Sequence, residues 1–185
     1  MESFNEFVDW LNACTAPRLC LDEVTARLQQ TQITLADVER NVVFSEERYQ
    51  RNLHVLGPKY YALLLCWLPG QASPIHDHRG ASCSIKVIQG NFTEQRYRPT
   101  TAGPLELIQE TRVTEGSVCG SQDDDIHRIT NLDDIPLVTL HIYSPYLSNF
   151  NIYDEATGER QVFCDPLVEA NAAKQQEMRS AGNPL

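Results

Sequence analysis

Short strand-like segments separated by turn residues fill residues 60–164, and this pattern constrains the fold most strongly. Residues 60–68 form a continuous apolar run before Pro69-Gly70, which is typical of a strand buried on both faces, although its periodicity alone also fits a buried helix. Many short strands with polar turns between them predict an all-β (mainly β) fold, either a barrel or a sandwich. The other strand patterns occupy residues 82–97 with a turn at 89–91, residues 105–113, residues 136–143 and residues 160–164.

Helical patterns flank these strands at both ends of the chain. Ser3 and Glu6 form a capping-box pattern before the first helix, and Asp165-Pro166 resembles the start of a C-terminal helix over residues 166–180. The prediction is therefore a single domain with a helical segment at 1–45, a β-barrel at 46–165 and a C-terminal helix and tail at 166–185. The apolar residues that carry the N-terminal helical period are Phe4, Phe7, Val8 and Leu11, then Leu21, Val24 and Leu28, then Leu35 and Val38.

Composition excludes several classes of partner. Fifteen Lys and Arg residues stand against 25 Asp and Glu residues, and a formal net charge of -10 repels a phosphate backbone, so nucleic acid is not an expected partner. No apolar run is long enough to cross a bilayer, and the acidic N-terminus does not resemble a secretory signal, so we expect a cytoplasmic protein without a membrane partner. The six cysteines form no Cys-x-x-Cys pair and are expected to be reduced. Oligomeric state is open, with a monomer plausible.

Three of the five histidines form the strongest candidate site. His76 and His78 are two residues apart, so on a strand their imidazoles project from the same face. His127 is the candidate third ligand. Neutral imidazole binds iron, zinc, copper and nickel, so the spacing predicts a transition-metal site. The alternative is a polar strand edge with two surface histidines.

The spacing around these histidines resembles the two motifs of the cupin superfamily. One stretch reads Gly70, five residues, His76-Asp77-His78, four residues, Cys83, six residues and Gly90, and another reads Gly116, ten residues, His127, three residues and Asn131. The resemblance implies a cupin jelly-roll β-barrel with a metal. Cys83 stands where cupins usually have a glutamate ligand, so three uncharged imidazoles would leave the metal its full charge and open positions for a thiolate, a nitrogen and dioxygen.

Five segments in order resemble cysteine dioxygenase more narrowly. They are Tyr49-Gln50-Arg51-Asn52-Leu53, Leu65-Cys66-Trp67, His76-Asp77-His78, Cys83, and Leu140-His141-Ile142-Tyr143-Ser144-Pro145. This resemblance implies an Fe(II) cofactor held by His76, His78 and His127. It also implies a reaction in which L-cysteine and O2 give cysteine sulfinic acid, a controlled step on the thiol oxidation ladder.

The same resemblance assigns roles around the metal. Arg51 would bind the substrate carboxylate with support from Tyr49, and it favours cysteine because the branch of the family that prefers 3-mercaptopropionate has glutamine there. Thr139, His141 and Tyr143 alternate on one strand, where the family has a Ser-His-Tyr hydrogen-bonded series with His141 and Tyr143 in catalysis.

Two covalent features also follow from the resemblance. Cys83 and Tyr143 match the pair that forms a thioether cross-link in the animal enzymes, and we expect partial cross-linking during turnover. Ser144-Pro145 matches a cis peptide bond in the family, although local preference favours trans.

Two other functions fit the sequence. A 3-mercaptopropionate dioxygenase would use the same iron site with different contacts to the substrate. A cupin without redox chemistry would bind zinc or nickel and consume no oxygen, and three histidines alone do not select the metal.

Overall fold

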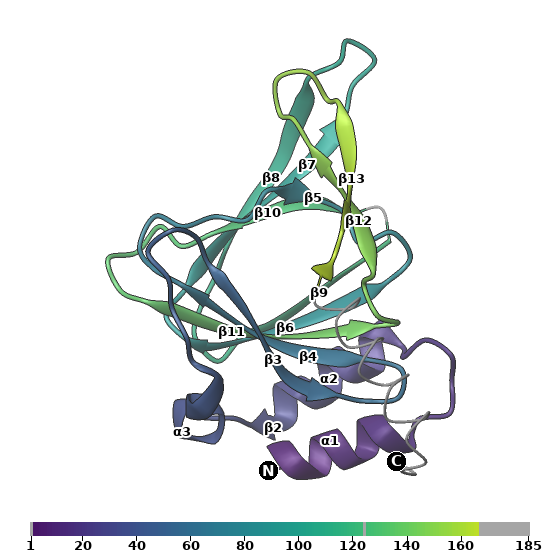
Figure 1. Cartoon of the computed structure of the whole chain (residues 1–185), viewed down its shortest axis with the longest axis vertical. Coiled ribbons are helices and arrows are strands. Elements are labelled where there is room, and N and C mark those ends of the chain that lie inside the picture. The colour runs from purple at the N-terminus through teal and green to yellow at the C-terminus, as the bar shows by residue number, and fades with distance from the viewer. Residues whose placement is uncertain (1, 124, 167–185) are drawn as a thin grey trace.

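Two antiparallel sheets face each other and form the walls of a barrel (Figure 1). The computed structural model describes residues 2–123 and 125–166. The strands are β1 (Glu2–Ser3), β2 (Thr31–Gln32), β3 (Gln50–Leu56), β4 (Tyr61–Trp67), β5 (Ile75–His76), β6 (Ser82–Gln89), β7 (Phe92–Pro99), β8 (Leu105–Val113), β9 (Val118–Gln122), β10 (Ile126–Thr130), β11 (Leu137–Ser144), β12 (Asn149–Tyr153) and β13 (Arg160–Cys164). The helices are α1 (Phe4–Ala13), α2 (Leu21–Gln30), α3 (Leu35–Val38) and the 3-10 helix η1 (Glu39–Asn41).

The strand order explains how distant segments meet. One sheet has the order β13-β12-β5-β10-β7-β8, and the other has the order β3-β4-β11-β6-β9. The chain therefore crosses between the sheets where β6 leads into β7. Gly90 makes this turn with a φ of 79°, a conformation that glycine adopts without steric cost. The mainly β jelly-roll prediction is confirmed.

Strand β4 is buried along its whole length because both faces of its sheet are covered. Ala62, Leu64 and Cys66 pack with the apolar faces of the helices, while Leu63 and Leu65 point into the barrel. This alternation confirms the strand interpretation of residues 60–68 over the buried helix, since successive side chains of a strand point to opposite faces.

The N-terminal helices form where the sequence predicts them and cover the outer face of the five-stranded sheet (Figure 1). Ser3 and Glu6 complete the capping box of α1. Phe7 and Leu11 of α1 and Leu28 of α2 are fully or almost fully buried against that sheet. The barrel interior on its other face is therefore left for the site.

Three local expectations have different outcomes in the structure. The Ser144-Pro145 bond is cis, as the family resemblance implied and against the local preference. Strand β5 ends at His76, so His78 lies beyond the strand on which the sequence placed both rings. Apart from Pro166, the expected C-terminal helix lies outside the described residues. No described helix has the length and hydropathy to span a membrane.

Candidate metal centre and substrate pocket

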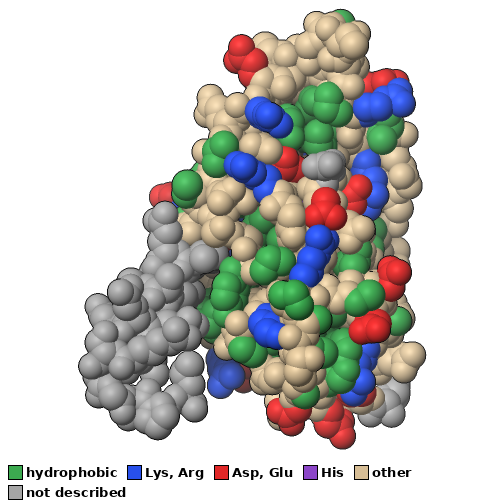
Figure 2. All heavy atoms as spheres, turned by 90° about the vertical axis from the view of Figure 1, so that its right-hand side faces the viewer, with side chains coloured by type: hydrophobic (Ala, Val, Ile, Leu, Met, Phe, Trp, Pro, Cys, Tyr) green, Lys and Arg blue, Asp and Glu red, His purple; other side chains and the backbone are tan. Residues whose placement is uncertain are grey.

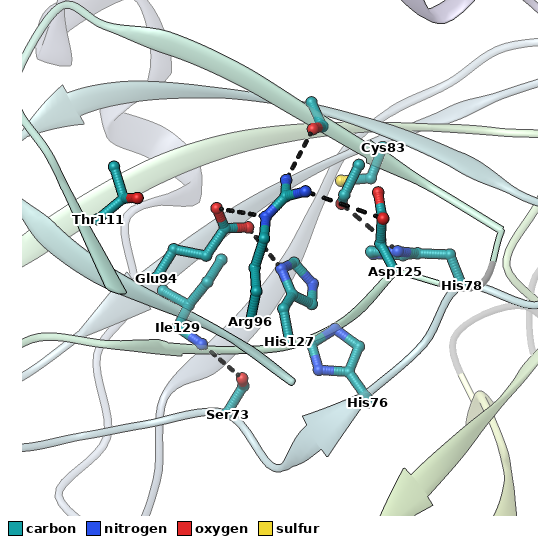
Figure 3. Close-up of polar contacts among 12 residues, drawn as sticks. Ser73, His76, His78, Cys83, Glu94, Arg96, Thr111, Asp125, His127 and Ile129 are labelled. Carbon is teal, nitrogen blue, oxygen red and sulfur yellow. Dashed lines mark hydrogen bonds and ion pairs between the residues drawn. The ribbon is translucent and has the colours of Figure 1, made fainter. Parts of the chain in front are cut away.

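Three imidazoles converge inside the barrel, as the sequence predicts (Figure 3). One ring nitrogen from each of His76, His78 and His127 lies within 4.8 Å of the others. Sheet pairing explains the convergence, because His76 on β5 lies opposite His127 on β10 in the antiparallel ladder. His78 follows two residues after His76, and its ring centroid lies 5.4 Å from that of His76 and 5.0 Å from that of His127.

The other ring nitrogens of the cluster contact oxygen atoms. His76 Nδ1 donates to the Pro74 carbonyl at 3.0 Å, and His127 Nδ1 donates to Glu94 Oε1 at 2.7 Å. His78 Nδ1 lies 3.4 Å from the Ser121 hydroxyl. A proton fixed on Nδ1 leaves Nε2 with a free lone pair, which is the arrangement of a metal-binding histidine. His127 Nε2 is buried with no hydrogen-bond partner among the described residues, as a metal ligand would be.

Burial lowers the pKa values of two of the three imidazoles. Burial, with a smaller effect from His127, lowers the pKa of His76 to about 3. The pKa of His78 lies well below its usual value for the same reasons. Neutral imidazole is the form that binds metal, and three such nitrogens suit a first-row divalent transition metal. No carboxylate among the described residues joins the cluster, so the donor set fits the three-histidine site that the sequence predicts.

Glu94 is a site residue that the sequence analysis missed. It lies on β7, is buried, and accepts from Arg96 Nε at 3.2 Å as well as from His127 (Figure 3). Burial by itself raises the pKa of the Glu94 carboxyl, but the contacts with His127 and Arg96 outweigh burial and lower it. The ionised carboxylate therefore orients the His127 ring. The available signal was alternation, which places Glu94 on the same strand face as the core residue Phe92.

Asp77 anchors the segment between the first two histidines. Its carboxylate accepts from the Asn151 backbone N at 3.0 Å, from Asn151 Nδ2 at 2.5 Å and from the Tyr153 hydroxyl at 2.8 Å. Both partners lie on β12, the neighbour of β5 in the sheet. These contacts hold His78 in position although the strand has already ended.

A pocket opens beside the cluster and contains most of the other predicted site residues. Tyr49, Arg51, His141 and Tyr143 line it together with the three clustered histidines. Tyr49 stacks on Trp67 with ring centroids 4.2 Å apart. The remaining lining residues are Leu65, Trp67, Ser73, Pro74, Ile85, Ile129, Leu147 and Phe150.

The three alternating residues of β11 form the expected hydrogen-bonded series. Trp67 Nε1 donates to Thr139 Oγ1 at 3.1 Å, and Thr139 Oγ1 lies 2.9 Å from His141 Nε2. His141 Nδ1 lies 3.4 Å from the Tyr143 hydroxyl and 3.6 Å from Cys83 Sγ. Cys83 and Tyr143 are also directly opposite each other in the β6–β11 ladder. The structure therefore brings all four residues together.

Arg51 has a partner that the sequence pattern assigns to another role. Its Nη2 donates to Asp165 Oδ2 at 2.8 Å, although the local pattern at Asp165 is that of a cap for a C-terminal helix. Burial by itself lowers the pKa of Arg51, but nearby Tyr143 and Asp165 outweigh burial and raise it. Arg51 is therefore a permanent cation at the edge of the pocket.

Glu94→Ala should weaken divalent-metal binding by about 10–100-fold, because His127 loses the acceptor that fixes its ring. Glu94→Gln, which keeps an acceptor oxygen, should lose less. Anaerobic titration of metal-free protein with Co(II) measures the affinity. Glu110→Gln is the matched control, since the Glu110 carboxylate lies exposed on β8 with Gln95 as its partner at 2.9 Å. Unchanged affinity in folded Glu94→Ala would contradict this role.

Comparisons with known proteins agree with the geometry. The family described as cysteine dioxygenase type I matches residues 17–156. Cysteine dioxygenase type 1 from Bos taurus is 32% identical over 145 residues, covering 76% of this chain and 72% of that protein. The Danio rerio protein of the same name is 31% identical over 146 residues, covering 75% and 72%.

Solved structures support the fold alone. TT1209 from Thermus thermophilus has a TM-score of 0.51 at 18% identity, covering 59% of this chain and 94% of that one. A conserved protein with a double-stranded β-helix domain from Klebsiella pneumoniae also has a TM-score of 0.51, at 15% identity, covering 69% and 87%. From the family match and its relatives, the chain belongs to the cysteine dioxygenase family, a family of thiol dioxygenases within the cupin superfamily.

Proposed function

We propose that this protein is an Fe(II)-dependent cysteine dioxygenase that converts L-cysteine and O2 to cysteine sulfinic acid. Both oxygen atoms of O2 are added to the thiol sulfur, so the reaction balances without another reductant. The observation that carries the proposal is the cluster of three imidazoles at a pocket edged by the Arg51 cation. The cluster supplies no negative charge, which suits an anionic thiolate substrate.

The metal ligands are His76, His78 and His127 in this proposal. When bound, Fe(II) supplies the redox chemistry that activates O2 and the Lewis acidity that favours the thiolate form of the substrate. Glu94 and Asp77 contribute by fixing the ligands. Loss of such a supporting contact commonly lowers metal affinity or activity by about 10–100-fold.

Arg51 positions the substrate. Its planar guanidinium is suited to grip a carboxylate through two parallel hydrogen bonds. A carboxylate held there would direct the thiol of a short amino acid toward the histidine cluster, which lines the same pocket. Tyr49, stacked on Trp67, supports this end of the pocket.

The hydrogen-bonded series on β11 determines where the Tyr143 proton can go. Trp67 can only donate, so Thr139 accepts from it and directs its own proton to His141 Nε2. The His141 proton then lies on Nδ1 and points toward the Tyr143 oxygen. Burial raises the pKa of Tyr143 well above its usual value, so the phenol keeps its proton and can donate it into the pocket. We assign Tyr143 as that donor and His141 as the residue that orients it.

Purified protein reconstituted with Fe(II) should consume O2 with L-cysteine and release cysteine sulfinic acid in a one-to-one ratio. His76→Ala should lose both the metal and all oxygen uptake, because two imidazoles do not hold the ion. An oxygen electrode with product analysis makes the measurement. Turnover of 3-mercaptopropionate in preference to cysteine would identify the sister activity. Folded, iron-loaded protein that consumes no O2 with either thiol would reject thiol oxidation and leave a non-redox cupin.

Arg51→Ala should retain Fe(II) but lower kcat/KM for L-cysteine by roughly 10–150-fold, since a charge-assisted hydrogen bond contributes about 1.5–3 kcal/mol. Steady-state oxygen uptake at varied thiol concentration measures the loss. Cysteamine is the internal control because it has no carboxylate, and its kcat/KM should not fall. An unchanged KM for cysteine would exclude the carboxylate-binding role.

We also propose that Cys83 and Tyr143 form a thioether cross-link in part of the population during turnover. The thiol hydrogen and one ring hydrogen beside the phenol are lost, a sulfur–carbon bond forms, and O2 accepts the two electrons. Peptide mapping after extensive turnover should show a Cys83–Tyr143 peptide lighter by two hydrogen atoms. Cys83→Ser and Tyr143→Phe should abolish that peptide. Full alkylation of Cys83 in denatured, turned-over wild-type protein would count against it.

A further inference from the structure

Asp165 is a fully buried carboxylate at the edge of the pocket, directly after the last strand, β13. Its Oδ2 accepts from Arg51 Nη2 at 2.8 Å and from the Tyr61 hydroxyl at 3.5 Å. Its backbone N donates to the Ser148 carbonyl at 2.8 Å. These contacts fix the carboxylate beside the cation to which we assign substrate binding.

The Arg51–Asp165 ion pair lies where two cavities share lining residues. Tyr49, Arg51, Pro74 and Phe150 line both the pocket beside the histidine cluster and a second, outer cavity. Asp165 lines the outer cavity. Figure 2 shows acidic and basic side chains mixed over one face of the molecule.

Among the described residues, Arg51 is the Arg, Lys, Asp or Glu side chain that lines the inner pocket, and Arg48 and Asp165 join it in lining the outer cavity. Arg48 lines the outer cavity but is exposed, so solvent screens it. The side chain of Arg51 is 17% exposed and that of Asp165 is 0% exposed. A substrate that reaches Arg51 therefore also meets the Asp165 carboxylate, and the charge of the proposed Fe(II) ion is common to all the substrates compared.

We propose that Asp165 determines substrate selectivity by charge, so that the pocket favours a zwitterionic amino thiol over an anionic thiol acid. This inference rests on the proposed thiol dioxygenase function. With the thiol protonated, L-cysteine has no net charge, 3-mercaptopropionate carries one negative charge and cysteamine carries one positive charge. The Asp165 carboxylate opposes the excess negative charge of 3-mercaptopropionate. It attracts the ammonium group that cysteine and cysteamine carry.

The Arg51–Asp165 contact leaves Arg51 able to bind a carboxylate. A guanidinium has five N–H donors, and the contact between Arg51 Nη2 and Asp165 Oδ2 uses one of them. Asp165 therefore orients Arg51 and reduces its net attraction for anions without occupying it. At a separation of ~10 Å and an effective dielectric constant of ~20, one unit charge changes the binding of another by on the order of tenfold.

Asp165→Asn tests the proposal because it removes the charge and keeps the shape and an acceptor oxygen. With Fe(II)-loaded protein, kcat/KM for 3-mercaptopropionate relative to cysteine should rise about tenfold, and the ratio for cysteamine relative to cysteine should fall by a similar factor. The matched control is Glu159→Gln, which removes one exposed charge just before β13 and should change neither ratio. Unchanged ratios in folded Asp165→Asn would overturn the proposal.

A second pair of variants tests the proposal if Asp165→Asn does not fold, since removing one partner of a buried ion pair destabilises a protein. Arg51→Gln/Asp165→Asn removes both members of this ion pair and should unfold at a higher temperature than Arg51→Gln alone. The double variant should also oxidise 3-mercaptopropionate better, relative to cysteamine, than Arg51→Gln does. Equal relative rates would overturn the selectivity role. Wild-type protein that oxidises none of the three thiols would instead reject the proposed function.

Discussion

The convergence of three imidazoles inside the barrel is the constraint on which the rest of the site depends. His78 and His127 are buried and His76 is partly buried, and the described residues place an oxygen atom beside Nδ1 of each ring. The orphaned nitrogen is His127 Nε2, on the other side of its ring. A shared metal ion satisfies such atoms without adding negative charge. The requirement for neutral rings also explains why the cluster lies in an enclosed pocket rather than on a strand edge.

The two sheets contribute different parts of the chemistry. The six-stranded sheet provides His76, His127 and Glu94 from the adjacent strands β5, β10 and β7. The five-stranded sheet provides Arg51 from β3 and the hydrogen-bonded series from β11. The pocket lies between these surfaces, so the proposed metal and substrate-binding groups face each other across it. The helices strengthen one wall from outside and leave the pocket to the strands.

Much of this arrangement could be predicted because it depends on local periodicity. Alternation placed Thr139, His141 and Tyr143 on one face, and they form the expected contacts. The spacing of His76 and His78 predicted their shared direction, but the structural reason differs. His78 lies past the end of β5, and the bonds from Asp77 to β12 hold the segment instead.

The carboxylates of the site were missed because their partners are distant in sequence. Glu94 resembles an ordinary charged strand residue until β7 pairs with β10 and brings it to His127. Asp165 has the local signature of a helix cap, yet its side chain bonds with Arg51, 114 residues away. Alternation places Glu94 on the core-facing side of β7, but no sequence pattern predicts either contact. Both residues contact a site residue that the sequence did identify. Glu94 contacts a proposed metal ligand, and Asp165 contacts the cation proposed to bind substrate.

Metal occupancy of the histidine cluster tests the central claim most directly. Crystals of protein loaded anaerobically with Fe(II) can be measured on both sides of the iron absorption edge. The account predicts one anomalous peak within bonding distance of a nitrogen from each of His76, His78 and His127. A peak at other side chains, or none at the cluster in protein that oxidises cysteine, would contradict it.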